Sequence, residues 1–310
     1  MLRYQARLAL DHPNARSLHL RPVPRTGGIA VMLGVLLAGF MLVPQSRLLL
    51  LGAAVLSAVS FFDDWRGMPA AVRLLIHSAV AAAAALLLVS DMPSPRLAIV
   101  IAATIWMTNL YNFMDGSDGL AGGMALFGFG SLAFAASSGG ALPLALIAAC
   151  VAASAAAFLV FNFSPARIFL GDAGSIPLGF LAAMLGVSGW QQQLWQPWYP
   201  LLVFSPFIVD ASATLAKRAL RCEKVWQAHR DHYYQRLILM GLGHRNTALG
   251  AYALMLASGC SGVWARTQSE PTQHLVLLVW ALLYALIFVL IDLQWNRHLL
   301  ASRSNAPGES

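Results

Sequence analysis

Charged residues are scarce in this chain, and their scarcity excludes most soluble folds. Only 11% of its 310 residues are charged, whereas a soluble protein usually carries about 25%. Hydrophobic residues make up 58% of the chain, and the mean hydropathy is +0.66. No hydrophilic stretch is long enough for a separate soluble domain. The composition therefore predicts an integral membrane protein in which residues 1–310 form a single domain.

Cysteine is also rare, and its spacing gives no sign of a metal module. The three cysteines, Cys150, Cys222 and Cys260, are far apart and form neither a CxxC nor a zinc-spaced pair. We also find no internal repeat, no signal peptide with a cleavage site, and no barrel-like alternation of polar and apolar residues. Because a chain in lipid must satisfy its backbone hydrogen bonds internally, we expect a bundle of helices.

Long apolar segments predict an all-α polytopic membrane protein with about ten transmembrane helices. Most of these segments approach the roughly 20 residues that a helix needs to cross a bilayer. The segment at 48–62 is short and gives the weakest prediction. The expected spans are residues 28–44, 48–62, 70–89, 96–113, 119–137, 141–161, 174–190, 198–216, 247–265 and 274–292.

Lysine and arginine concentrate in alternate connections between the expected spans. If residues 1–27 lie in the cytoplasm, the connections on that side, together with Arg73, hold 17 of the 20 basic residues. This positive-inside pattern accounts for the net charge of +7, so we do not infer nucleic acid binding. The cytoplasmic segments would then be residues 1–27, 63–69, 114–118, 162–173, the large loop 217–246 and the C-terminal tail 293–310.

Aspartates follow the same division, which predicts an active-site cleft at the cytoplasmic face. The other face holds Asp91 and Glu270. Acids placed at random in loops would be shared more evenly, so their concentration indicates one site assembled from several connections. The aspartates on or next to cytoplasmic connections are Asp63, Asp64, Asp115, Asp118, Asp172 and Asp231.

The segment NLYNFMDGSDGL places amides and carboxylates at the end of an apolar span. Its polar residues recur every third position, a spacing that would spread them around a regular helix of about 3.6 residues per turn. Gly116 predicts a break that could gather them. The alternative is a polar loop whose last aspartate caps the next helix. Because polar groups inside a membrane are costly and usually functional, we favour a site. The residues concerned are Asn109, Asn112, Asp115 and Asp118.

Two further motifs contribute carboxylates. In FFDDWRG, the adjacent Asp63 and Asp64 should repel each other, so one of them could hold a proton and act as a general base. An ordinary acidic loop is the alternative. In GDAGS, Asp172 precedes an apolar span, where it could cap the helix or bind a metal that bridges to a phosphate.

Basic motifs on the same face could bind an anion. His229, Arg230 and His232 lie together in the large loop, where they suit a phosphate, although a basic loop attracted to anionic lipid fits equally well. Arg25 precedes a glycine pair at the start of the first span, and here the alternative is simple positive-inside charge. The residues alone therefore indicate a membrane-embedded site for a hard cation such as magnesium and a phosphorylated substrate.

In combination, these motifs resemble those of the polyprenyl-phosphate N-acetylhexosamine-1-phosphate transferase family, glycosyltransferase family 4. The resemblance runs from about Asp11 to Arg245, with the motifs in family order on one expected face. It implies that a polyprenyl-phosphate oxygen attacks the β-phosphorus of a UDP-N-acetylamino sugar, that UMP leaves, and that Mg²⁺ is required, with Mn²⁺ as an alternative. The motifs are PNARSLH with PRTGG, FFDDW, NLYNFMDGSDGL, FNFSPARIFLGDAGS and AHRDHYYQRL.

The resemblance also implies roles for particular residues. Asp172 matches the metal-binding aspartate of the family, and Asn112 matches an asparagine near that metal. The adjacent aspartates match an acidic pair, one member of which is a proposed base, and the acids of NLYNFMDGSDGL match positions that shape the nucleotide pocket. The expected catalytic residues are therefore Asp63, Asp64, Asp115 and Asp118, and the expected substrate-binding residues are Asn109, Arg25, His229, Arg230 and His232.

The last cytoplasmic loop indicates the branch of the family. The peptidoglycan branch has consecutive histidines there, whereas this chain has HRDH, so initiation of O-antigen or capsule synthesis is favoured. The donor would be UDP-N-acetylglucosamine or a 6-deoxy relative such as UDP-N-acetylfucosamine. The alternatives are a phospho-N-acetylmuramoyl-pentapeptide transferase and, in another class, a transporter or flippase, which would carry polar groups at mid-membrane.

The resemblance also sets expectations for location and assembly. Relatives have a further helix before PNARSLH, which is expected to be absent here because only ten residues precede Asp11. The expected location is the bacterial inner membrane, with the active site facing the cytoplasm. The expected partners are the lipid bilayer, polyprenyl phosphate and the UDP-sugar, and a homodimer is left open.

Overall fold

A computed structural model describes residues 10–11, 22–89, 91–224, 227 and 229–304 of the chain. The protein is almost entirely helical, which confirms the all-α polytopic fold. The strands of the described part, β1 (Leu10–Asp11) and β2 (Val23–Pro24), form one short antiparallel pair. The motif PNARSLH, at 13–19, lies outside the described residues.

Every apolar segment that was expected to span the membrane contains a helix. Among the described residues, seven helices are long and apolar enough to cross a membrane. The total of about ten spans stays a prediction. The first helices are α2 (Gly27–Leu42), α3 (Arg47–Arg66) after a 3₁₀ turn η1 (Pro44–Ser46), α4 (Ala70–Leu88), α5 (Ser94–Phe113), α6 (Leu120–Ser138), α7 (Leu142–Asn162) and α8 (Asp172–Gln191). The later elements are α9 (Trp198–Val203), α10 (Ser205–Leu220), α11 (Tyr233–Leu237), a π turn η2 (Ile238–Leu242), α12 (Gly243–Ala265) and α13 (Glu270–Ser304).

The boundaries differ from the expectation in the C-terminal third of the chain. The expected span at 198–216 is divided into α9 and α10, because Pro206 in the first turn of α10 cannot donate a backbone hydrogen bond. The large loop is shorter than 217–246, since α10 continues to Leu220 and α11 begins at Tyr233. The expected tail at 293–310 is helical through Ser304, because residues 272–304 contain neither glycine nor proline to end the helix.

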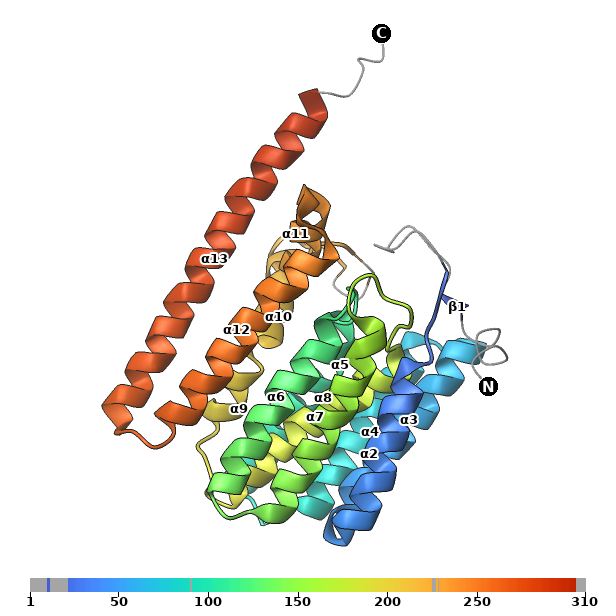
Figure 1. Cartoon of the computed structure of the whole chain (residues 1–310), viewed down its shortest axis with the longest axis vertical. Coiled ribbons are helices and arrows are strands. Elements are labelled where there is room, and N and C mark those ends of the chain that lie inside the picture. The colour runs from blue at the N-terminus through green and yellow to red at the C-terminus, as the bar shows by residue number, and fades with distance from the viewer. Residues whose placement is uncertain (1–9, 12–21, 90, 225–226, 228, 305–310) are drawn as a thin grey trace.

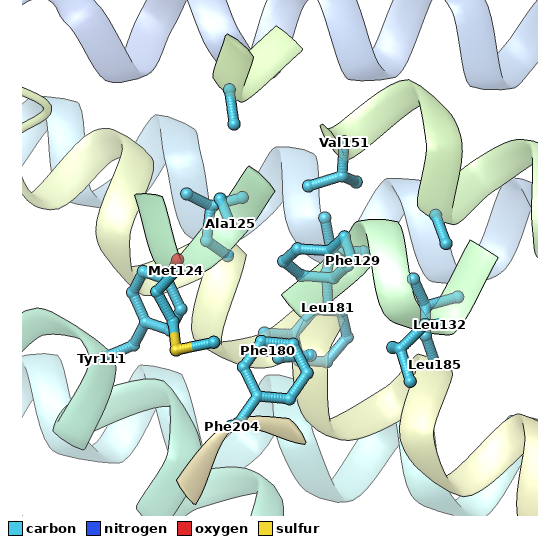
Figure 2. Close-up of a cluster of buried hydrophobic side chains, with 14 of the residues drawn as sticks. Tyr111, Met124, Ala125, Phe129, Leu132, Val151, Phe180, Leu181, Leu185 and Phe204 are labelled. Carbon is cyan, nitrogen blue, oxygen red and sulfur yellow. The ribbon is translucent and has the colours of Figure 1, made fainter. Parts of the chain in front are cut away.

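Helix α8 lies at the centre of the bundle, in contact with α2, α3, α5 and α6. Figure 2 shows the aromatic side chains that fill the space beside it, among them Phe129, Phe180 and Phe204. The rings of Phe129 and Phe204 meet edge to face at 5.4 Å. A Cβ atom on Gly28 would overlap the backbone of Gly174, so these glycines let α2 and α8 approach closely. This packing fixes the start of α8 at one end of the bundle.

The connections that carry the polar motifs gather at that end, which we call the polar end. It consists of residues 22–26, 67–69, 114–119, 163–171 and the described part of 221–232. In Figure 1 it lies at the top of the bundle, near α11 and β1, whereas the α6–α7 and α12–α13 turns lie at the bottom. Helix α13 continues well past the polar end. The expected site residues in the described part of the chain therefore lie at or near one end of the bundle.

Candidate functional site

The connection 163–171 organises the polar end, because three other segments are bonded to it. One of them is the stretch around β2, which runs beside it like a strand. Phe169 donates its N–H to the Pro24 carbonyl at 2.8 Å, Gly27 donates to Phe169 at 2.9 Å, and Gly28 donates to Leu170 at 2.8 Å. This pairing holds the intervening Arg25 beside the start of α8.

The other side of the same connection is held by Asn162 and Asp118. The Asn162 Oδ1 accepts from the Gly119 N–H at 3.0 Å, and its Nδ2 donates to the Ile168 carbonyl at 2.9 Å. The Asp118 Oδ2 accepts from the Ala166 N–H at 3.0 Å. The interpretation of Asp118 as a helix cap is wrong, because the cap position of α6 is Gly119, with φ of 75°, and no side chain caps it. Asp118 instead ties two connections together.

The acidic cluster forms around Gly171, whose φ of 72° turns the chain into α8. A Cβ atom at this position would lie 2.9 Å from the Arg25 carbonyl oxygen and 3.5 Å from the Asp64 Oδ2. The Asp115 carboxylate faces the Gly171 backbone N–H. Asp172 follows directly as the first residue of α8, and no side-chain bond caps that helix, so the interpretation of Asp172 as a cap is also wrong. The structure therefore brings these predicted residues together.

The adjacent aspartates of FFDDW have different surroundings. The Asp63 carboxylate is buried and accepts from the Met68 N–H at 2.5 Å and from Arg73 Nη1 at 2.9 Å. The same Arg73 nitrogen lies 3.7 Å from Asp172 Oδ2. The Asp64 Oδ2 is buried and has no hydrogen-bond partner among the residues that the structure describes. Asp63 is thus already used to hold Arg73, whereas Asp64 keeps an oxygen for a ligand.

The polar residues of NLYNFMDGSDGL diverge, because α5 ends at Phe113 and the next residues form a turn. The expected break is therefore confirmed. Asn112 faces Asp172 and accepts from Ser175 Oγ at 2.8 Å. Asn109 lies one turn deeper and donates to the Ile105 carbonyl at 2.7 Å, away from the acidic cluster. Only the middle of the motif contributes to the cluster.

The electrostatic field of the cluster is visible at Asp115. Burial, and then the negative charge of Asp172, raises the pKa of Asp115 well above its ordinary value, and the Arg25 guanidinium opposes this effect. The Arg25 guanidinium is also within electrostatic range of Asp64 and Asp172. The carboxylates therefore share two nearby cations, Arg25 and Arg73, and a further cation would relieve their repulsion.

The loop that carries HRDH is anchored by a residue that the sequence analysis missed. Asp210 of α10 is buried and lies 3.2 Å from His232 Nδ1. It also accepts from the backbone N–H groups of Tyr233 and Tyr234, each at 3.0 Å. The ring of His229 lies 4.9 Å from that of His232. Burial, followed by the charges of His232 and Arg218, lowers the pKa of His229 to about 4, so this ring is neutral at pH 7.

Tyr234 connects this loop with the acidic cluster. Its hydroxyl lies 3.4 Å from the Phe113 carbonyl oxygen, and a Cβ atom on Gly116 would collide with it. Its phenol is also within electrostatic range of Asp115. Arg230 is half-buried in the same loop. In contrast, Arg236 turns away and bonds to Asp292 of α13 at 2.8 Å. His229, Arg230 and His232 therefore belong to the polar end, with His232 held by Asp210, whereas Arg236 is directed to α13.

The donors in the cluster fit a hard divalent cation. Among the described residues, no group of three or more His, Cys, Asp or Glu side chains is arranged to hold a metal. Magnesium, however, commonly takes one or two carboxylates and completes its shell with water and substrate phosphates. Asp172, Asp64 and Asn112 supply oxygen donors, although the Asn112 oxygen also accepts from Ser175, and the buried Asp64 Oδ2 lacks a partner within the described part of the chain. This is the donor chemistry that Mg²⁺ prefers.

The fold and the site define a polytopic membrane protein with an acidic cluster and a basic loop at one end. Comparison with known proteins points to a family. The family model described as glycosyl transferase family 4 matches residues 46–189, and the curated relatives named below support the same family. The protein is therefore a membrane-embedded transferase.

Curated relatives are similar over most of the chain. A Bacillus subtilis (strain 168) protein named "Probable undecaprenyl-phosphate N-acetylglucosaminyl 1-phosphate transferase" is 27% identical, over 92% of this chain and 83% of the relative. A decaprenyl-phosphate N-acetylglucosaminephosphotransferase of Mycobacterium leprae (strain TN) is 28% identical, over 79% and 73%. A phospho-N-acetylmuramoyl-pentapeptide-transferase of Picosynechococcus sp. is 27% identical, over 63% of this chain and 59% of the relative.

Proposed function

We propose that this protein transfers an N-acetylamino-sugar 1-phosphate from a UDP-sugar to polyprenyl phosphate and releases UMP. The observation that carries the proposal is the convergence of Asp64, Asp115, Asp172 and Arg25 around Gly171, at the end of a membrane-embedded bundle. Transfer of a phosphorylated sugar between a soluble donor and a lipid needs charged groups at a membrane boundary, and it depends mainly on positioning and charge neutralisation. The names of the long-matching relatives support the same reaction.

The arrangement of the cluster suggests separate roles for its residues. Asp172 and Asn112 would hold Mg²⁺, which when bound neutralises charge on the diphosphate. Asp64 has the free buried oxygen, so we assign to it the contact with the metal or the incoming lipid phosphate. Asp63 holds Arg73 in place beside Asp172. In this scheme the acidic pair of the motif has one member that binds and one that positions.

The remaining expected residues surround this centre. Arg25 sits beside the acids, where it would attract the diphosphate once a metal neutralises the carboxylates. His229, Arg230 and His232 would contact the sugar or the diphosphate from the loop that Tyr234 fastens to the cluster. Because His229 is neutral at pH 7, it would act through hydrogen bonds rather than charge.

We further propose that the polar end faces the cytoplasm at the bacterial inner membrane and that the donor is UDP-N-acetylglucosamine or a 6-deoxy relative. The distribution of basic residues supports this orientation, since 17 of 20 fall on that side. The loop sequence HRDH favours the branch that initiates O-antigen or capsule synthesis. The peptidoglycan reaction is the second candidate, because one relative carries that name over 63% of this chain.

The test is UMP release by protein purified in detergent. Undecaprenyl phosphate, Mg²⁺ and a panel of UDP-N-acetylamino sugars, including UDP-N-acetylmuramoyl-pentapeptide, are supplied together, and the lipid or the metal is then left out in turn. We expect release that needs both, with the preferred donor identifying the branch. Folded, monodisperse protein that releases no UMP with any donor would overturn the proposal, and so would release that continues without lipid. Mn²⁺ in place of Mg²⁺ tests the alternative metal.

A further inference from the structure

A polar cavity lies between α10 and α13, away from the acidic cluster. Its volume is about 410 Å³, and its wall includes Lys217, Arg221, Arg236, Asp292, Trp295 and Asn296. Figure 1 shows α13 passing the end of the bundle beside α11 and continuing beyond it. The mechanism proposed above uses none of these residues.

The charges in this cavity leave a positive excess. Lys217 and Arg236 both bond to the Asp292 carboxylate, the latter at 2.8 Å. Asp231 also lines the cavity, and its carboxylate shares Arg218, which lies outside the lining, with Glu223. Arg221 adds an exposed guanidinium at the mouth. Within the lining, three cations face two carboxylates, Asp231 and Asp292, and the excess of one positive charge suits an anion.

The position of the cavity along α13 indicates the edge of the hydrocarbon layer. Residues 275–291 of α13 are apolar except Tyr284, and Asp292 begins its polar stretch. Trp295 is of the type that concentrates at membrane boundaries. Leu220 and Leu299 also line the cavity, and the Leu220 side chain is 85% exposed. A soluble anion would leave these leucines exposed to water, whereas the acyl chains of a lipid would bury their apolar surface.

We infer that this cavity binds the phosphodiester headgroup of an anionic phospholipid, such as phosphatidylglycerol, with the acyl chains against Leu220 and Leu299. Basic pockets between membrane helices at the cytoplasmic side are suited to such headgroups. Arg221 and Asn296 would donate to the phosphate, while Asp292 keeps Lys217 and Arg236 in place beside it.

A lipid bound in this cavity would affect the loop next to the acidic cluster through α11. Tyr233, the first residue of α11, bonds to Lys217, donates its N–H to Asp210, and stacks on Phe288 of α13 at 3.8 Å. A lipid that fastens α13 to α10 and α11 would therefore steady the loop that holds His232. This consequence rests on the proposed function, whereas the binding itself does not.

The test measures lipid binding without any sugar donor. Purified protein is titrated with phosphatidylglycerol or phosphatidylcholine in matched detergent, and bound lipid is counted by native mass spectrometry. The variant Arg221→Gln removes one cation of the cavity. The matched control is Arg297→Gln. Arg297 is an exposed residue of α13 that follows Asn296 directly in the sequence but does not line the cavity. We expect phosphatidylglycerol to bind in preference, and Arg221→Gln to weaken it about fivefold, as for the loss of one basic contact near a lipid surface.

The other outcomes would each overturn the inference. Equal binding of phosphatidylcholine would show that no anion is recognised. Equal weakening by Arg221→Gln and Arg297→Gln would show a diffuse basic surface rather than a site. Undecaprenyl phosphate is the other lipid with a phosphate, so it is added as a competitor; if it occupies the site that Arg221→Gln weakens and phosphatidylglycerol does not, the cavity belongs to the substrate. None of these readouts requires UMP release, so the binding inference and the proposed function can fail separately.

Discussion

Asp210 of α10 and the aspartates around Gly171 differ in how their oxygens are used. Asp210 is buried and accepts from Thr214 Oγ1 at 3.2 Å, from two backbone N–H groups and from a histidine. Around Gly171, the buried Asp64 Oδ2 has no partner among the described residues, and Asp172 faces the Asn112 amide and has Arg73 at 3.7 Å, beyond hydrogen-bond distance. A buried acid whose oxygens are all satisfied stabilises the fold. Neighbouring acids with unused oxygens are suited to a ligand, which separates the two groups by chemistry rather than by sequence motif.

The substitution Asp172→Asn should have the largest effect on activity. It keeps the shape of the side chain but removes a charged metal ligand, and we expect UMP release to fall about a thousandfold because several kcal/mol of charge stabilisation is lost. The melting temperature without metal should not fall, since the change relieves repulsion with Asp64 and Asp115. Addition of Mg²⁺ should raise the melting temperature of the original protein and not that of the variant.

The matched control is Asp91→Asn at the opposite end of the bundle, where the side chain is exposed. It removes the same charge and should leave both UMP release and the Mg²⁺-dependent shift unchanged. Full activity of purified Asp172→Asn would remove Asp172 from the site.

The substitution Gly28→Ala should have the next largest effect. Its Cβ atom would lie 2.6 Å from the Leu170 carbonyl oxygen and would overlap the Gly174 backbone, so α2 and α8 must separate. Displacement of Arg25 and Asp172 by a fraction of an ångström to about 1 Å should lower UMP release about 10-fold to 100-fold. The control is Gly130→Ala in α6, where an added Cβ meets nothing within 4 Å. Equal activity of the two alanine variants would contradict the close packing of α2 on α8.

The substitution Asp210→Ala should lower the stability of the protein more than its catalytic activity. It leaves two backbone N–H groups and His232 without their acceptor, each lost bond costing about 1–3 kcal/mol. We expect a clearly lower melting temperature, and activity per folded molecule within about tenfold of the original. Asp210→Asn retains an acceptor, so its melting temperature should lie between those of the original protein and Asp210→Ala. An unchanged melting temperature for Asp210→Ala would contradict the structural role.

The sequence was sufficient for features that depend on local pattern. Each apolar segment that hydropathy located contains a helix, and the glycine at 116 indicated the break that turns Asp115 toward the cluster. The contacts that depend on chain reversal were missed. Arg73 counted only as a basic residue near the membrane, yet the short connection 67–69 folds α4 back so that Arg73 meets Asp63.

Asp210 shows a different reason for failure. A signal was present, because an acid inside the apolar segment 198–216 is costly unless it is bonded. Its partners, however, come from residues 232–234, and no local pattern joins the two regions. The same holds for Tyr234, whose contact with Phe113 spans 121 positions. Such side-chain contacts follow from packing and not from periodicity.

The smallest effect is expected from Asp118→Asn. This substitution tests whether an aspartate that holds a connection differs in function from the aspartates around Gly171. The resemblance to relatives implies that Asp118 belongs to the catalytic group, whereas its Oδ2 accepts from the Ala166 N–H and holds the connection 163–171. An asparagine oxygen can accept the same bond, so we expect UMP release within about twofold of the original. Asp118→Ala cannot accept it and should lose both stability, by about 1–3 kcal/mol, and activity. If Asp118→Asn instead fell as far as Asp172→Asn, the charge of Asp118 itself would be required, and an aspartate with a satisfied oxygen could still act directly on the substrate.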